Sequence, residues 1–181
     1  MNALLDVLAA REAENMRVVN SVHGLIEDQE LLLESLGVYD EYKAIHAAYA
    51  QLVGAESSHE ALKRALFIQW FYLTEPAFLS GIGEVDQQAE LAVLTQLEHL
   101  LLTRQADAEL ATMLGYYATW EYVFQRPEFL HLTALQAFVA ARMTSDASST
   151  AQSNRLGEMT GRGQMGTYWQ SRNRSKLWET A

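Results

Sequence analysis

The sequence predicts an all-α protein: a single compact bundle of about six helices followed by a polar, largely irregular C-terminal arm. Apolar residues recur at three- and four-residue steps, and no stretch alternates apolar and polar residues for long enough to form a strand. Capping residues, glycines and two prolines divide this pattern into helices with short connections, which is typical of a bundle. The predicted division places the bundle at residues 1–143 and the arm at residues 144–181. Four glycines between Gly157 and Gly166 are expected to prevent a stable helix in that part of the arm.

The first two predicted helices cover residues 3–36 and 40–54. Gly24 marks a point where the first helix bends or splits. Asp40 is placed to cap the second helix and Gly54 to end it. The apolar stripe of the first helix consists of Leu4, Leu8, Val19, Val22, Ile26, Leu33 and Leu36.

A third helix begins in residues 57–60, Ser-Ser-His-Glu, which have the spacing of a capping box. This helix is apolar on nearly all sides over residues 62–73, so we expect it at the centre of the bundle. Asp86 and Asp107 then cap a fourth and a fifth helix, and Pro127 begins a sixth that runs to the end of the bundle.

The formal net charge of −10 is unevenly distributed along the chain. Residues 1–143 contain 8 Lys and Arg against 20 Asp and Glu, whereas residues 144–181 contain 5 against 3. An acidic body repels phosphate backbones, so we expect no nucleic acid to bind to it. The absence of cysteine excludes disulfides, thiolate metal sites and thiol nucleophiles.

We expect neither a secretory signal nor a membrane span. The first residues carry no basic segment, and Asp6 interrupts their short apolar run. The most apolar stretch, residues 65–83, contains Gln69, Glu75 and Pro76 and is expected to form a buried helix. These features predict a cytoplasmic protein that does not enter a membrane.

Two segments of the chain resemble each other. Each reads Trp-x-Tyr, then Leu or Val, then two or three residues and Pro-x-Phe-Leu, and the two contain the only prolines. Both fit a helix that ends in aromatic residues and restarts after proline. Three interpretations stay open: two corners that pack the core, a duplicated helix pair, or a ligand pocket between the corners. The candidate pocket residues are Trp70, Tyr72, Glu75, Tyr117, Trp120 and Arg126.

Glu75 lies among apolar neighbours and therefore needs a partner, because an unpaired buried carboxylate is costly. When the two segments are aligned on their prolines, Arg126 occupies the position that matches Glu75. We therefore predict that Glu75 pairs with Arg126 and that Trp70 lies near Trp120.

Two Glu-x-x-His pairs have the spacing that places two metal ligands on one helix face: Glu56 with His59, and Glu128 with His131. Both pairs lie at predicted helix starts, where acidic side chains are favoured by the helix dipole and face water. We therefore expect no metal site and no cofactor. The sequence leaves enzymatic activity uncertain and favours its absence.

The sequence favours a helical binding protein that engages protein partners or self-associates. The arm combines aromatic and basic residues, which an acidic surface can accept, and the expected partner-binding residues are Tyr168, Trp169 and Trp178. The alternative is a small-molecule or metal-dependent helical enzyme with its pocket near the two Trp-x-Tyr corners. A cavity between Trp70 and Trp120 favours the enzyme, and a filled core there favours the interaction protein.

Overall fold

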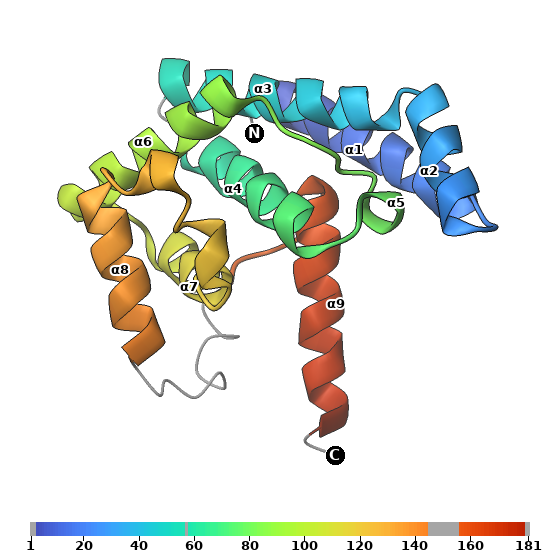
Figure 1. Cartoon of the computed structure of the whole chain (residues 1–181). Helices are drawn as coiled ribbons and strands as arrows, with labels where there is room; N and C mark the ends of the chain where they lie inside the picture. The colour runs from blue at the N-terminus through green and yellow to red at the C-terminus, as the bar shows by residue number, and fades with distance from the viewer. Residues whose placement is uncertain (1–2, 57, 145–155, 180–181) are drawn as a thin grey trace.

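Helices make up all the regular structure of the described residues, which confirms the all-α fold class. The computed structural model describes residues 3–56, 58–144 and 156–179, with the backbone alone for residues 55, 56, 121 and 174–179. These ranges contain nine α-helices and two short 3-10 helices, where we expected about six helices (Figure 1). The α-helices are α1 (Ala3–Ser21), α2 (Ile26–Ser35), α3 (Val38–Glu56), α4 (His59–Thr74), α5 (Ala77–Ser80), α6 (Gln87–Leu102), α7 (Ala108–Tyr117), α8 (Thr133–Thr144) and α9 (Gly163–Glu179), and the 3-10 helices are η1 (Glu121–Val123) and η2 (Pro127–Phe129).

The helix α4 lies at the centre of the bundle, as its apolar sequence predicts. Its residues from Ala61 to Trp70 are all buried, on every side of the helix. The helices α3 and α6 pack on each other and on α4, and α1 packs on α3 (Figure 1). The buried residues of α4 include three polar ones, Lys63, Arg64 and Gln69. Within the described ranges, neither α4 nor any other helix is long and apolar enough to cross a membrane.

Three helices begin at capping residues that the sequence indicates. The side chains of Ser58, Asp86 and Asp107 each accept a hydrogen bond from the backbone N–H three residues further on, at 3.2, 2.9 and 2.7 Å. Two other predicted ends of a helix are wrong. α3 begins two residues before Asp40, so Asp40 lies in the first turn and not at the cap. The helix dipole stabilises a negative charge at this position. The same helix continues two residues past Gly54.

The predicted first helix is divided in two. α1 ends at Ser21 and α2 begins at Ile26, with Gly24 between them at a φ of +132°, which residues with a side chain rarely adopt. This break turns the chain, so that Leu33 is the only buried residue of α2. Ile26 and Leu36, which belong to the predicted apolar stripe, are exposed.

The predicted sixth helix is also divided. Pro127 begins the single turn η2, and α8 begins only at Thr133. The cap of α8 comes from α6, because the carboxylate of Glu98 accepts hydrogen bonds from the N–H groups of Ala134 and Leu135 at 2.9 and 2.8 Å. A partner from another helix therefore sets the start of α8, rather than the proline.

In the described part of the C-terminal arm, Gly163–Glu179 form the helix α9, where we expected irregular structure. α9 forms even though Gly166, which we expected to prevent a helix, lies in its first turn. Met159, Met165 and Trp169 belong to the hydrophobic core, and α9 packs on α1 and α4 (Figure 1). The described part of the arm is thus integrated with the bundle. The predicted domain boundary itself stays a prediction.

Candidate functional site

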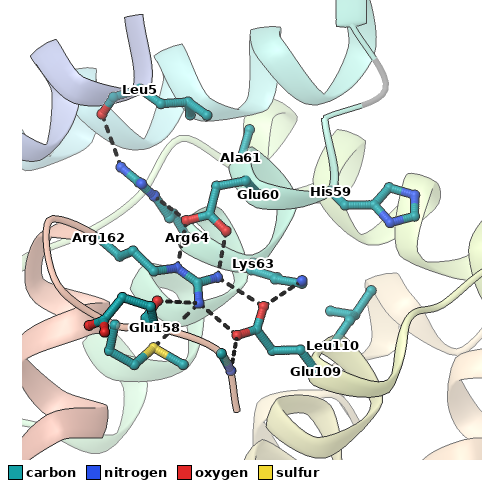
Figure 2. Close-up of polar contacts among 12 residues, drawn as sticks. Leu5, His59, Glu60, Ala61, Lys63, Arg64, Glu109, Leu110, Glu158 and Arg162 are labelled. Carbon is teal, nitrogen blue, oxygen red and sulfur yellow. Dashed lines mark hydrogen bonds and ion pairs between the residues drawn. The ribbon is translucent and has the colours of Figure 1, made fainter. Parts of the chain in front are cut away.

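A buried guanidinium joins the arm to the bundle. Arg162 directly precedes α9 and lies between Glu60 of α4 and Glu109 of α7 (Figure 2). Its Nε and Nη2 donate hydrogen bonds to Glu60 at 2.8 and 2.5 Å, and its Nη1 and Nη2 donate to Glu109 at 2.6 and 3.0 Å. Forked pairs between arginine and carboxylate are among the strongest hydrogen bonds that side chains form. We call these three residues the arginine clamp.

The charges continue beyond the arginine clamp with alternating sign. Lys63 donates to Glu109 at 2.6 Å and lies 2.8 Å from Asp107. On the other side, Arg64 donates from its Nε to Glu60 at 2.7 Å. Each charge therefore faces an opposite charge, which is the condition for keeping ionic groups inside a protein.

The pKa of Glu109 reflects this environment. Burial by itself disfavours the ionised carboxylate. The hydrogen bonds from Arg162, from Lys63 and from the N–H of Gly157 outweigh that effect and lower the pKa of Glu109 to about 2. Glu109 therefore keeps its charge throughout the ordinary pH range, and with it the attraction to Arg162.

A second contact between arm and bundle is made by Glu12 of α1, whose exposed fraction is 1%. Its Oε1 accepts a hydrogen bond from the Tyr49 hydroxyl at 2.5 Å, and its Oε2 accepts one from the N–H of Gln164 at 2.8 Å. Glu12 thus caps the first turn of α9 from another helix. Burial raises the pKa of Glu12 to about 7, in spite of these two hydrogen bonds.

Two glycines permit this close packing of the arm. Gly163 has a φ of +61°, and a Cβ at this position would lie 2.4 to 2.5 Å from the carboxylate atoms of Glu12. A Cβ on Gly166 would lie 2.1 Å from the carbonyl oxygen of Met159. The glycines that we expected to prevent a helix instead let α9 approach its neighbours.

Trp70 and Trp120 lie close together, with 5.3 Å between their ring centroids, which confirms this prediction. Tyr117 stacks on Trp70 at 4.8 Å, and Tyr168 meets the same indole at 5.2 Å. The Nε1–H of Trp169 donates to the Tyr117 hydroxyl at 3.2 Å. Aromatic rings therefore fill the space between the two corners, and this aromatic cluster has the character of a packed core.

The aromatic residues of the arm contact the chain's own bundle. Trp169 is buried, and the hydroxyl groups of Tyr168 and Tyr116 are hydrogen-bonded at 2.6 Å. The guanidinium of Arg172 lies 4.0 Å from the centre of the Tyr116 ring. The side chain of Trp178 lies outside the described residues. The arm thus docks intramolecularly through at least two of its three predicted aromatic residues.

The predicted pair of Glu75 and Arg126 is wrong, because Arg126 forms its ion pair with Glu90 of α6. Tyr72 joins this pair: its hydroxyl accepts from Arg126 Nη1 at 3.2 Å and donates to Glu90 at 3.4 Å. Burial and the charge of Glu90 raise the pKa of Tyr72 to about 12. Glu90 is buried and needs a cation, whereas Glu75 is only half-buried and keeps contact with water.

Two of the six predicted pocket residues, Tyr72 and Arg126, line a polar hollow of about 430 Å³. The other lining residues come from α3, from the connection before α6 and from α6 itself. Trp70, Tyr117 and Trp120 lie instead in the packed aromatic cluster. The remaining charged residues of the polar hollow are Lys43, Glu84, Asp86 and Glu90.

The two Glu-x-x-His pairs lie on different elements of the fold. His59 lies 3.6 Å from Asp107, while the side chain of Glu56 is outside the described residues. Glu128 and His131 are exposed, at η2 and in the turn that follows it. Among the side chains that the structure describes, no group of three or more His, Asp or Glu could hold a metal ion.

Large aliphatic side chains are exposed on α2 and on α5, which packs against it. Leu25, which precedes α2, and Leu31 are 71% and 65% exposed. Such side chains are normally buried in a folded protein. We call this region the α2–α5 surface; its large exposed members are Leu25, Ile26, Leu31, Leu32, Leu36 and Leu79.

An electronegative groove of about 500 Å³ lies beside the α2–α5 surface. Burial, together with the charges of Glu30 and Glu34, raises the pKa of Tyr39, and the buried Tyr39 hydroxyl has no hydrogen-bond partner among the described residues. The groove therefore offers several carboxylates to a partner. It is lined by Glu27, Glu30, Leu31, Glu34, Tyr39 and Ala77.

Sequence reasoning missed Glu12, Arg162 and the α2–α5 surface. One signal exists for Glu12, which shares the buried face of α1 with Leu5 and Leu8, where an acidic residue is unusual. Arg162 has no local signal, because its two carboxylate partners are 102 and 53 residues away in the sequence.

Comparison with known proteins assigns no family: no family model, curated protein or solved structure matches the chain significantly. Function must therefore be inferred from the residues and contacts themselves.

Proposed function

We propose that the protein is a helical interaction module that binds a basic, amphipathic helix of a partner protein on its α2–α5 surface. The observation that carries this proposal is that α2 buries one residue, Leu33, and exposes its other large aliphatic side chains. Contiguous apolar side chains on a protein surface are typical of interfaces with other proteins.

A helix is the form of partner that fits this surface. Leu25 precedes α2, Leu32 lies within it and Leu36 directly follows it. Their spacings of seven and four residues place them along one side of the helix. A row of this kind packs against a matching apolar row on a second helix. Recognition of amphipathic helices commonly uses side chains at this spacing as anchors.

The charge around the surface favours a basic partner. Residues 26–35 contain four acidic residues and no basic residue. A second copy that used the same surface would place acidic groups opposite acidic groups, which is unfavourable across an interface. A lysine or arginine beside the apolar row of a partner could instead enter the groove and pair with Glu30 or Glu34.

Two further expectations from the sequence belong to the same proposal. One is a cytoplasmic location. The other is that the acidic body does not bind nucleic acid, and the electronegative groove supports it, because phosphate groups are repelled by such a surface.

A synthetic helical peptide of leucine and lysine, with leucines at three- and four-residue steps, tests the proposal by fluorescence anisotropy. We expect it to bind the wild-type protein and to bind the Leu32→Ser/Leu36→Ser variant at least about tenfold more weakly. Leu130→Ser is the matched control, because Leu130 is similarly exposed but lies at η2. This control should leave the affinity unchanged.

A leucine–glutamate peptide of the same pattern should not bind, since its charges repel those of α2. Equal binding of the leucine–lysine peptide to wild type and to the Leu32→Ser/Leu36→Ser variant would overturn the proposal. Concentration-dependent self-association that this variant abolishes would identify a second copy as the occupant and would also contradict a basic partner.

A second candidate function is a small-molecule site in the polar hollow. It is favoured by Tyr72 and Arg126, which line the hollow beside the buried carboxylate of Glu90. Cationic and acidic side chains that line the same hollow suit a zwitterion such as a free amino acid. Calorimetric titration with amino acids should then give binding to wild type that Arg126→Gln loses. No binding to wild type would exclude this candidate.

A further inference from the structure

The carboxylate of Glu12 is enclosed where the arm meets α1. Tyr49 of α3 donates to one of its oxygens and the N–H of Gln164 to the other. The backbone of Gly163 lies so close that a Cβ there would overlap the carboxylate. Because the side chain is 1% exposed, water cannot replace these contacts while the arm is docked.

No cation pairs directly with Glu12 among the described residues. Arg64 of α4 is the cation that faces it, but its Nη1 donates to the carbonyl of Leu5 at 2.9 Å and to the Tyr49 hydroxyl at 3.4 Å. The Nε of Arg64 donates to Glu60, whose negative charge also acts on Glu12. The charge of Glu12 is therefore only partly compensated.

The other elements around Glu12 add little positive charge. The phenol of Tyr42 on α3 is buried, and its hydroxyl has no hydrogen-bond partner among the described residues. α5 contains no titratable residue, and Arg162 of the arm directs its guanidinium to Glu60 and Glu109. A neutral carboxylic acid therefore suits this position better than a carboxylate.

We propose that docking of the arm, residues 156–179, on α1 is coupled to the uptake of one proton by Glu12. In the protonated acid, Oε1 donates to the oxygen of Tyr49, and Oε2 still accepts the N–H of Gln164, so both contacts persist. Release of the arm opens the carboxylate to water, where the ionised form is favoured and the proton leaves.

The sign of the effect follows from linkage. The pKa of Glu12 is about 7 with the arm docked, against 4.5 for an ordinary glutamate. A raised pKa in the docked state means that the contribution of Glu12 is complete below pH 4.5 and is lost as the pH rises through 7. Between these values docking should weaken about tenfold per pH unit, and at most about 300-fold in total.

The arginine clamp has the opposite pH dependence. Glu109, with a pKa of about 2, keeps its full attraction for Arg162 above pH 4.5 and loses it only as the pH falls toward 2. The clamp is therefore constant in the range where Glu12 titrates. Docking should be strongest near pH 4.5 and should weaken toward pH 8.

Amide hydrogen exchange of the full chain, followed by mass spectrometry from pH 5 to pH 8, tests this coupling. After correction for the intrinsic exchange rate, the opening constant of residues 163–169 should increase toward high pH in wild type, while peptides from α6 serve as an internal reference. Glu12→Gln imitates the neutral acid, so its opening constant should stay small and independent of pH. Glu128→Gln, at an exposed position, should behave as wild type.

A pH dependence that is the same in Glu12→Gln and in wild type would overturn the proposal. If Glu12→Gln does not fold, carbon NMR of the glutamate carboxyl groups in the wild-type protein decides. One carboxyl that titrates near pH 7 supports the coupling. Titration of every glutamate near or below its ordinary pKa contradicts it.

Discussion

Replacement of Arg162 by alanine removes the guanidinium that holds the arm. Four charge-assisted hydrogen bonds are lost, and Glu60 and Glu109 are left with Arg64 and Lys63 as their cations. Breaking a buried ion pair costs about 3–5 kcal/mol. The side chain of Glu60 remains 29% exposed, so water screens part of the effect. We therefore expect Arg162→Ala to lower the free energy of unfolding by about 3 kcal/mol.

Urea unfolding followed by circular dichroism measures this loss, with Arg17→Ala as the matched control. Arg17 pairs with Glu14 on the exposed face of α1, where its side chain is 72% exposed. An exposed pair contributes about 0–1 kcal/mol, so the control should be nearly neutral. For a chain of this size, 3 kcal/mol corresponds to a decrease in Tm of about 6–12 °C.

The double variant Arg162→Ala/Glu109→Gln separates lost attraction from an uncompensated charge. In the single variant Glu109 keeps Lys63 as its only cation among the described residues. If its charge is then incompletely compensated, neutralising it should restore about 1 kcal/mol. A loss of less than about 1 kcal/mol in Arg162→Ala, equal to that of Arg17→Ala, would refute the stabilising role of the arginine clamp.

Other predictions concern neighbouring contacts and use the same unfolding assay. Gly163→Ala should cost about 2–4 kcal/mol, since it adds a Cβ at positive φ against a carboxylate, whereas Gly37→Ala, at a φ of +71° in open space, should cost only about 1–2 kcal/mol. Glu98→Ala removes the acceptor for two N–H groups of α8 and should cost about 1–2 kcal/mol. Because the pKa of Glu109 is lowered in the folded protein, wild type should lose stability between pH 4.5 and pH 2, and Glu109→Gln should lose less over this range.

The features that the sequence predicted correctly depend on neighbours in the chain. Asp86 and Asp107 cap their helices because the N–H groups that they accept from are three residues away. The central position of α4 follows from apolar residues on all of its sides. The contact of Trp70 with Trp120 is an exception, because these residues are distant in the sequence. It was predictable only from the similarity of the two segments that contain them.

The features that were not predictable depend on which helices meet. Arg126 pairs with Glu90 and not with Glu75, the partner that the similarity of the two segments suggested. The pairing follows from the burial of Glu90, whose carboxylate needs a cation. Leu36 fits an apolar stripe, but periodicity does not say whether another helix covers that stripe. Gly166 permits α9 because it meets the backbone at Met159, a contact that no local pattern indicates.

The position of the arm in the sequence has a consequence for the order of events during synthesis. The N–H of Gln164 meets Glu12 across 152 residues, and Arg162 meets Glu60 across 102. Every helix that the arm contacts is therefore made by the ribosome before the arm exists. Until then, Glu60 and Glu109 lack their shared cation, and Trp70 lacks the ring of Tyr168. Contacts of such sequence separation slow folding, so a nascent chain that stops before residue 156 should remain loosely packed and sensitive to proteases.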